Sequence, residues 1–213
     1  IRMAVELDLI ETLDMAVVEQ AVAKMARDSK LKLAVNVSGR TISSPAFIEG
    51  VRKMLAARPD VRGRLMFELT ESAAIDDLAA ADRHLQALRG EGCLVCLDDF
   101  GAGAASLAYL QQLSLDIVKI DGRYIRELQQ GGRENTFLRH LVQMCAELGV
   151  KTLAEMVETP QTEEAVRRAG VDYAQGWLYG AATDKPEAPG YSEPVIGAAK
   201  PAARRQGSRE SWG

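Results

Sequence analysis

The chain has 213 residues, of which 47% are apolar and 26% are charged, and its formal net charge is −4. This composition is typical of a folded globular domain with one sizeable core. The negative charge argues against general nucleic-acid binding, although it leaves room for a local basic pocket. No apolar run is longer than a strand, and acidic residues interrupt the start of the chain, so we expect neither a membrane span in this segment nor a signal peptide.

The three cysteines are expected to be reduced core residues of a cytoplasmic protein. Cys93 and Cys96 have C-x-x-C spacing, but they lie in a strand pattern, where residues an odd number apart face opposite sides. A shared metal or a disulfide between them is therefore not expected. Cys145 falls on the apolar stripe of a predicted helix.

Six short apolar runs alternate with helical patterns along the chain. The predicted strands are Leu31–Ser38, Arg64–Glu71, Cys93–Phe100, Ile117–Ile120, Lys151–Val157 and Tyr173–Tyr179. Their nearly continuous apolar character is that of strands buried on both faces. Five helices are predicted. The first follows a cap at Asp14, and the second begins at Ser44-Pro45. The next two carry the apolar stripes Leu78–Leu88 and Phe137–Leu148, and a short last helix ends at Gly170.

This alternation implies parallel strands joined by right-handed crossovers. A doubly wound open sheet and an α/β barrel both fit, and the lack of a glycine-rich phosphate loop after the first strand favours the barrel. We predict a (β/α)8 TIM-like barrel over residues 1–183, incomplete, with about six of eight strands present. Because the chain begins at Ile1, we expect the other two strands to precede it. Residues 184–213 lack periodicity and are expected to form a disordered tail.

Polar residues recur where successive predicted strands end. They are Asn36, Glu68, Glu71, Asp98, Asp99, Lys119, Asp121, Glu155, Glu158 and Gln175. In an α/β barrel these strand ends converge on one face, where active sites are built. Buried carboxylates need neutralisation, and hard divalent cations bind carboxylate and amide oxygens. The pattern predicts a divalent-metal site with one lysine that orients a water or a phosphate oxygen, and hence metal-assisted phosphoester hydrolysis.

Each of these residues also has a simpler interpretation when it is taken alone. Glu158 fits a solvated rim residue, Asn36 a turn former, and Lys119 a barrel lysine paired to an acid for structural reasons. The side chains of Asp98 and Asp99 should face opposite sides of a strand, so at least one of them fits a loop cap. The repetition from strand to strand favours a functional site.

The same residues stand in six ordered motifs that resemble the EAL domain family. The motifs are VNVS at Val35–Ser38, ELTE at Glu68–Glu71, DDFG at Asp98–Gly101, VKID at Val118–Asp121, AE-x-VET at Ala154–Thr159 and QG at Gln175-Gly176. The resemblance covers roughly residues 1 to 180. It implies a (β/α)8-like barrel that binds cyclic di-GMP, and active members use Mg²⁺ or Mn²⁺ to hydrolyse this nucleotide to linear pGpG.

The resemblance also implies a role for each site residue. Asn36, Glu68, Asp98 and Asp99 resemble the family's metal ligands. Lys119 resembles the lysine that contacts the attacking water and the phosphate, and Glu155 resembles the catalytic-site glutamate. Substrate-binding or ligand-supporting roles fall to Glu71, Asp121, Glu158 and Gln175, and Glu71 is similar to the glutamate that steadies the loop after the aspartates.

The chain departs from the family pattern at several positions. The Glu-Ala-Leu signature, whose glutamate is a metal ligand, lies upstream of the matching region. The usual DFGTGYSSL loop reads DFGAGAASL, so Ala102, Ala104 and Ala105 replace residues that would anchor the loop. Gly122 stands where an arginine is common, and Met156 replaces a glycine.

Two functions stay open at this point. The retained charged positions favour a metal-dependent cyclic di-GMP phosphodiesterase in bacterial second-messenger signalling, whereas the altered loop favours a catalytically inactive cyclic di-GMP receptor or interaction module. Without the family, a third interpretation is another metal-dependent barrel enzyme that acts on a carboxylate or phosphate. We expect the full-length protein to be a hydrolase and this segment alone to be inactive. We also expect a homodimer that forms through the EAL-like domain, and sensory or GGDEF-type domains upstream.

Overall fold

The computed structural model describes residues 9–70, 75–101, 106–128 and 133–181. Within them, six strands form one sheet in which each strand pairs in parallel with its sequence neighbours. The strands are β1 (Leu33–Val37), β2 (Leu65–Thr70), β3 (Leu94–Phe100), β4 (Ile117–Ile120), β5 (Lys151–Ala154) and β6 (Tyr173–Ala174). All six predicted strands are confirmed, although β5 and β6 end earlier than predicted. The predicted tail lies outside the described residues.

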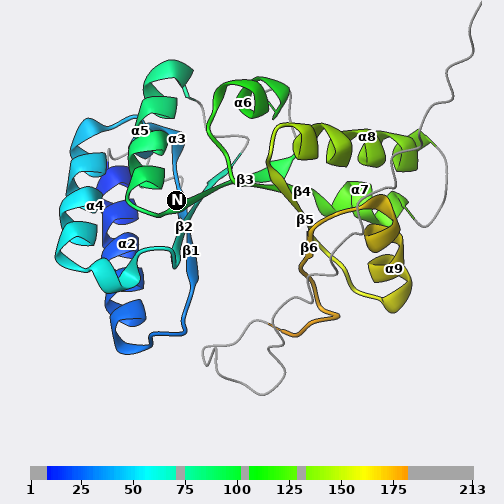
Figure 1. The fold of residues 1–213 in the computed structure, drawn as a ribbon, viewed down its shortest axis with the longest axis horizontal. Helices are drawn as coiled ribbons and strands as arrows, with labels where there is room; N and C mark the ends of the chain where they lie inside the picture. Colours follow the sequence, from blue (N-terminus) through cyan, green and yellow to red (C-terminus); the bar gives the residue numbers. More distant parts are fainter. Residues whose placement is uncertain (1–8, 71–74, 102–105, 129–132, 182–213) are drawn as a thin grey trace, which may run out of the picture.

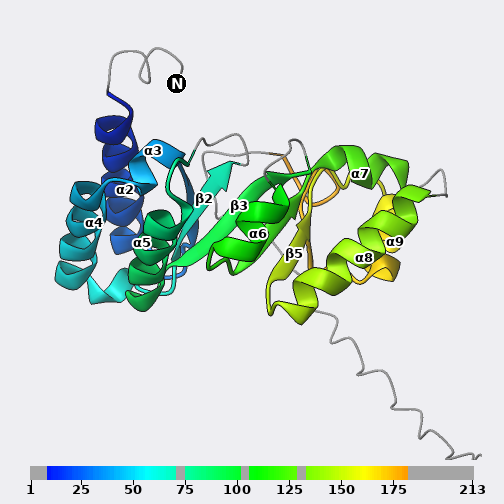
Figure 2. The same cartoon turned by 90° about the horizontal axis from the view of Figure 1, so that it is seen from above.

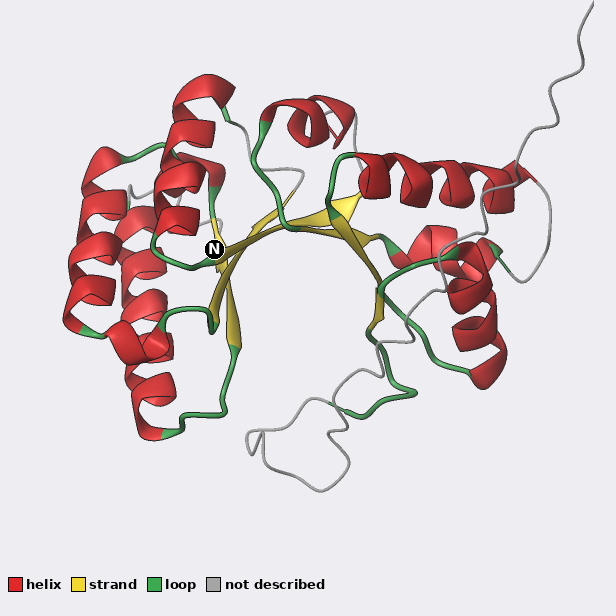
Figure 3. Ribbon diagram, in the orientation of Figure 1, coloured by secondary structure: helices red, strands yellow, loops and turns green. Residues whose placement is uncertain are grey.

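Helices cover the convex side of this sheet, which curls into an arc (Figures 1 and 3). They are α2 (Ile10–Arg27), α3 (Gly39–Ile42), α4 (Pro45–Ala57), the 3₁₀ helix η1 (Pro59–Val61), α5 (Leu78–Gly90), α6 (Ser106–Gln112), α7 (Gly122–Glu127), α8 (Arg133–Glu147) and α9 (Pro160–Ala169). Seen from above, α2, α4 and α5 lie at one end of the sheet, and α7, α8 and α9 lie together at the other (Figure 2). Sequential parallel strands with helices outside them are the arrangement of a TIM-like barrel, of which this sheet forms a part.

The main core lies between the sheet and its helices. Leu65, Phe67 and Leu69 of β2 are buried there, and Phe67 meets Phe47 of α4 edge to face with ring centroids 6.5 Å apart. The alternate residues of β2 face the concave side and are only partly buried. On the neighbouring strand, Leu94 lies opposite Met66 and is 41% exposed. The concave face is therefore less well covered than the convex face.

Two helix boundaries follow the predicted sequence signals. The Ser44 hydroxyl accepts a hydrogen bond from the Phe47 amide at 3.4 Å, and Pro45 occupies the first turn of α4. Gly170 ends α9 in the left-handed conformation with φ +86°, which glycine adopts without steric cost. Local chemistry thus determined these two ends.

Asp14 does not cap a helix, and that prediction was wrong. The helix α2 begins at Ile10, so Asp14 lies inside it and is buried. Its carboxylate accepts a hydrogen bond from the Ser38 amide at 3.0 Å, directly after β1. The acid satisfies a backbone donor at the start of α3, 24 residues away. Only the tertiary structure brings these two groups together.

The three cysteines are free and buried, as predicted. Burial raises the pKa of the Cys93 thiol to about 12 and that of Cys145 to about 11, and it also raises the pKa of Cys96. Such thiols carry almost no thiolate near neutral pH and are poor nucleophiles. Over the part of the chain that the structure describes, no helix is both long enough and apolar enough to span a membrane.

The short last strand is held by Asp172, which immediately precedes β6. Its carboxylate accepts hydrogen bonds from Lys151 Nζ at 2.7 Å, the Thr152 amide at 2.9 Å and the Thr152 hydroxyl at 3.0 Å. Burial acts to raise the pKa of Asp172, but these hydrogen bonds outweigh burial and hold its pKa below the ordinary aspartate value. The ionised carboxylate therefore stabilises the junction of β5 and β6.

We expect Asp172→Asn to lower the free energy of unfolding by about 1–2 kcal/mol at pH 7, because an amide replaces an ionised acceptor of three bonds. The pKa of Asp172 is lower in the folded chain than in the unfolded chain, where it is about 4. Its ionised carboxylate therefore stabilises the fold fully above that pH, and this stabilisation is lost as the pH falls through the folded-state pKa. The difference between variant and parent should thus shrink at pH 3. Urea unfolding at the two pH values measures it, and a difference that does not change with pH would contradict the ionic role.

Candidate functional site

Lys119 lies at the centre of a group of acids on the concave face. Its side chain is only 8% exposed, and its Nζ donates to Asp98 Oδ1 at 2.8 Å and to Glu155 Oε1 at 2.9 Å. Glu68 Oε2 lies 3.6 Å from the same Nζ. The acids come from β2, β3 and the residue directly after β5, so one ammonium group bridges several elements of the sheet.

The strand register places these side chains together. Glu68 lies opposite Cys96, so Asp98, two residues further along β3, points to the same face. Lys119 lies opposite Leu153, and Glu155 is again two residues further on. Although β5 ends at Ala154, the Glu155 amide still donates to the Ile120 carbonyl at 3.3 Å, and this bond continues the alternation.

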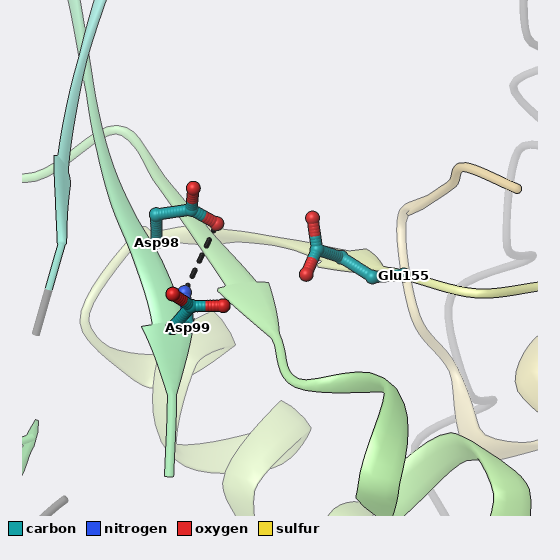
Figure 4. A group of neighbouring side chains, drawn as sticks. All are labelled: Asp98, Asp99 and Glu155. Atoms are coloured by element: carbon teal, nitrogen blue, oxygen red, sulfur yellow. Dashed lines mark hydrogen bonds between the residues drawn. The ribbon is translucent and has the colours of Figure 1, made fainter. Parts of the chain in front are cut away.

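Asp99 joins the same group, contrary to the expectation that adjacent aspartates face opposite sides. Asp98, Asp99 and Glu155 each offer a carboxylate oxygen, and these oxygens lie within 4.8 Å of one another (Figure 4). Asp99 has φ +57°, the strand register shifts between Leu97 and Phe100, and the Asp99 amide donates to Asp98 Oδ1 at 3.0 Å. Strand alternation fails here because the backbone is not extended at Asp99.

The site carries more negative charge than Lys119 neutralises. Burial raises the pKa of the Glu68 and Glu155 carboxyls, and the nearby ammonium offsets only part of that shift. Burial and the neighbouring Asp98 also raise the pKa of Asp99. Burial acts to lower the pKa of Lys119, but its hydrogen bonds to Asp98 and Glu155 outweigh burial and keep it protonated. A further cation is the natural complement of this group.

Two other predicted site residues lie beside this group. Asn36 on β1 is exposed and lies opposite Glu68 in register. Asp121 follows β4 and caps α7, where its carboxylate accepts from the Arg123 amide at 2.7 Å and from Arg123 Nε at 3.2 Å. Asn36 is thus placed beside an acid of the group, whereas the contacts of Asp121 are to the helix.

The remaining predicted residues are not joined to the group by side-chain contacts that the structure shows. Glu158 is exposed. The backbone of Gln175 binds the loop after β5, because its amide donates to the Ala154 carbonyl at 2.8 Å and its carbonyl accepts from Val157 at 3.0 Å. The predicted supporting residue Glu71 lies outside the described residues, as do Ala102, Ala104 and Ala105.

Two of the departures from the family pattern contact each other, which the sequence did not reveal. Met156 has φ +57°, a conformation that costs free energy for any residue with a β-carbon. Its side chain lies against Gly122 at the start of α7, and a β-carbon at position 122 would overlap Met156 Sδ and Cγ. The small residue on the helix therefore makes room for the large one beside Glu155.

We expect Gly122→Ala to lower the free energy of unfolding when residue 156 is methionine and to raise it when residue 156 is glycine. In the parent chain the new methyl group meets Met156 and should cost about 1–3 kcal/mol of unfolding free energy. In a Met156→Gly background that obstacle is gone, and the same change should stabilise by about 0.5 kcal/mol because alanine favours a helix. Urea unfolding of the four proteins forms a double-mutant cycle. Equal effects in both backgrounds would show that the contact is unimportant.

Relatives of this chain include proteins with an assigned activity. It is 33% identical over 179 residues to the cyclic di-GMP phosphodiesterase PdeF of Escherichia coli, covering 82% of this chain and 24% of PdeF. It is 30% identical over 176 residues to the cyclic di-GMP phosphodiesterase PdeB of Shewanella oneidensis, covering 81% of this chain and 21% of PdeB. The chain thus spans less than a quarter of the length of these two relatives.

Solved structures give the same result for the fold. An EAL domain protein of Listeria monocytogenes matches with a TM-score of 0.77 and 27% identity, over 84% of this chain and 72% of that one. The EAL domain of Xanthomonas citri FimX, solved in complex with c-diGMP, matches with a TM-score of 0.76 and 26% identity, over 85% and 73%. The family model of the EAL domain matches residues 1–182. The chain therefore belongs to the EAL domain family.

Proposed function

We propose that this chain forms the larger part of a phosphodiesterase domain that hydrolyses cyclic di-GMP to linear pGpG with a divalent metal. The observation that carries the proposal is the buried Lys119 ammonium, held between Asp98 and Glu155 with Glu68 beside it. The relatives named as cyclic di-GMP phosphodiesterases support the choice of substrate.

The donor set fits Mg²⁺ or Mn²⁺. Both are hard cations that take carboxylate and amide oxygens. The oxygens of Asp98, Asp99 and Glu155 lie within 4.8 Å of one another. In the proposed site Asp98 and Asp99 bind the metal together with Glu68 and Asn36, and Glu155 stays beside it as the catalytic glutamate. A bound divalent ion supplies an acidified water and stabilises charge on the phosphate.

The protein side chains have separate tasks in the proposed reaction. Lys119 orients the attacking water and pairs with the phosphate charge, while Glu155 accepts a proton from that water. Its raised pKa makes Glu155 a stronger base than an ordinary glutamate. The water oxygen bonds to phosphorus, one bond between phosphorus and a ribose 3′ oxygen breaks, and that oxygen takes up a proton. We propose that Gln175, Asp121 and Glu158 contact the substrate or support the metal ligands. Glu71 has a supporting role of this kind in the family pattern.

We further propose that residues 1–183 belong to an eight-stranded barrel completed by two strands upstream. β1 and β6 are the edges of the described sheet, and this chain covers 72% and 73% of the two solved EAL domains. The chain covers 24% of PdeF, which supports one domain of a larger protein, and we place that domain in a signalling protein of the cytoplasm.

A cyclic di-GMP receptor without catalysis is the second candidate. The alanines that replace the loop anchors, and the large side chain of Met156 beside Glu155, favour it. A receptor needs the pocket but not a precise arrangement of water, lysine and glutamate.

The test uses the chain extended upstream through the two proposed strands. Cyclic di-GMP is added with Mg²⁺ or Mn²⁺, binding is followed by calorimetry, and pGpG is followed by chromatography. Metal-dependent release of pGpG supports the phosphodiesterase. Binding without release supports the receptor, and the absence of both binding and release overturns the two proposals together.

A further inference from the structure

Tyr124 contacts the backbone that directly follows the two aspartates. It lies in the first turn of α7, which begins immediately after β4 and is capped by Asp121. Its hydroxyl donates to the Gly101 carbonyl at 3.2 Å. β3 and β4 pair as far as Phe100 and Ile120, so the start of α7 lies beside the end of β3. A helix residue thus reaches the chain two positions beyond Asp99.

The Tyr124 ring occupies the space that a side chain at position 101 would need. A β-carbon there would overlap the Tyr124 ring, and Gly101 has φ +95°, which disfavours any other residue. Contact and conformation therefore both require glycine. The ring and the hydroxyl hold the same peptide group at close range.

The position of the Tyr124 ring is itself fixed from α8. Phe137 stacks on it with ring centroids 5.1 Å apart and planes 26° apart. Such a stack adds attraction beyond the area that it buries. Phe137 is 46% exposed, so this support lies at the surface of the molecule. The two rings form a continuous contact from the outside of α8 to the end of β3.

Asp99 is the residue that needs this support. Its left-handed conformation is unfavourable for a residue with a β-carbon, and such conformations persist only where the surroundings impose them. On one side, Asp98 is held by Lys119 at 2.8 Å. On the other side, Phe100 is paired to β4 and Gly101 is bound by Tyr124. The strained residue lies between two fixed points.

We propose that Tyr124 is a positioning residue for Asp98 and Asp99, which acts by fixing the Gly101 peptide through its hydroxyl and ring. The direction of the Asp99 carboxylate toward Asp98 and Glu155 depends on this contact. The consequence for metal binding rests on the proposed function, whereas the consequence for the backbone at residues 98–101 does not.

The first experiment compares Tyr124→Phe with the parent chain of 213 residues by Mn²⁺ titration calorimetry. Phenylalanine keeps the ring but not the hydroxyl, and we expect Mn²⁺ affinity to fall about fivefold, the factor that corresponds to one hydrogen bond. The matched control is Tyr179→Phe, which removes a hydroxyl bond of 3.3 Å to Glu163 of α9. The control should leave Mn²⁺ affinity unchanged. Thermal midpoints of both variants show whether either is globally destabilised.

The second experiment measures amide hydrogen exchange without metal. Peptides that span residues 94–101 should exchange faster in Tyr124→Phe than in the parent chain or in Tyr179→Phe. If the parent chain of 213 residues takes up no Mn²⁺, the exchange result alone decides the role of Tyr124, and the proposed metal site is decided on the chain extended upstream. Unchanged exchange in Tyr124→Phe overturns the proposal. Unchanged Mn²⁺ affinity in a parent chain that binds the ion also overturns it.

Discussion

Replacing Asp98 with asparagine is expected to weaken Mn²⁺ binding by about 100-fold or more, because the number of charged oxygen ligands sets affinity for such ions. Asp98 is the acid closest to Lys119, at 2.8 Å, and its Oδ1 also accepts the Asp99 amide. Asparagine has nearly the same size, so the change removes charge and leaves the packing in place. Titration calorimetry with Mn²⁺, on the chain extended upstream through the two proposed strands, measures the loss.

The control for this variant is Asp76→Asn. Asp76 is exposed and precedes α5, so the change removes the same charge at the protein surface. Mn²⁺ affinity should remain at the parent value in this control. If Asp98→Asn bound Mn²⁺ as tightly as the parent, the assignment of the acidic group as the metal site would be wrong.

Lys119→Met is expected to lower the free energy of unfolding by about 3 kcal/mol at pH 7 without metal, as removal of one partner from a buried ion pair does. Glu68, Asp98 and Glu155 have side chains only 12%, 14% and 19% exposed, so water replaces little of the lost interaction. Methionine has a similar length and shape, which keeps the packing term small. Urea unfolding in the presence of a chelator measures the difference.

Added Mn²⁺ should stabilise Lys119→Met more than it stabilises the parent chain, because the ion supplies the positive charge that the variant lacks. The control is Lys53→Met, because the side chain of Lys53 is 75% exposed and its Nζ lies 3.5 Å from Glu49 Oε1. Such surface pairs contribute at most about 1 kcal/mol, so the control should unfold nearly as the parent does. Equal stability of Lys119→Met and the parent would show that the acids do not depend on the lysine.

The strands and much of the site were predictable because they depend on local repetition. Parallel strands in register put every second residue on one face, so Glu68, Asp98 and Lys119 follow from the pattern alone. The same alternation also placed Glu155 correctly, although β5 ends one residue before it. Boundaries such as Ser44-Pro45 and Gly170 were set by local caps.

The errors and omissions all involve contacts between distant parts of the chain or departures from regular backbone. Asp14 looked like a cap, but its partner lies 24 residues away. The opposite orientation expected for Asp98 and Asp99 assumed an extended strand, which the φ of +57° at Asp99 interrupts. The contact of Tyr124 with Gly101 spans 23 residues. Its only sequence signals are a glycine after the second aspartate and an aromatic residue early in the next helix.

The single lysine also has a consequence for ion stoichiometry. With all four acids ionised (Glu68, Asp98, Asp99 and Glu155), the ammonium of Lys119 leaves the group with a net charge of −3. One divalent ion would leave −1, which repels a phosphodiester anion. Two divalent ions would leave +1, which one phosphodiester group balances. If the proposed function holds, nucleotide affinity would therefore depend on the second ion, and the free divalent-metal concentration would set how much cyclic dinucleotide is bound.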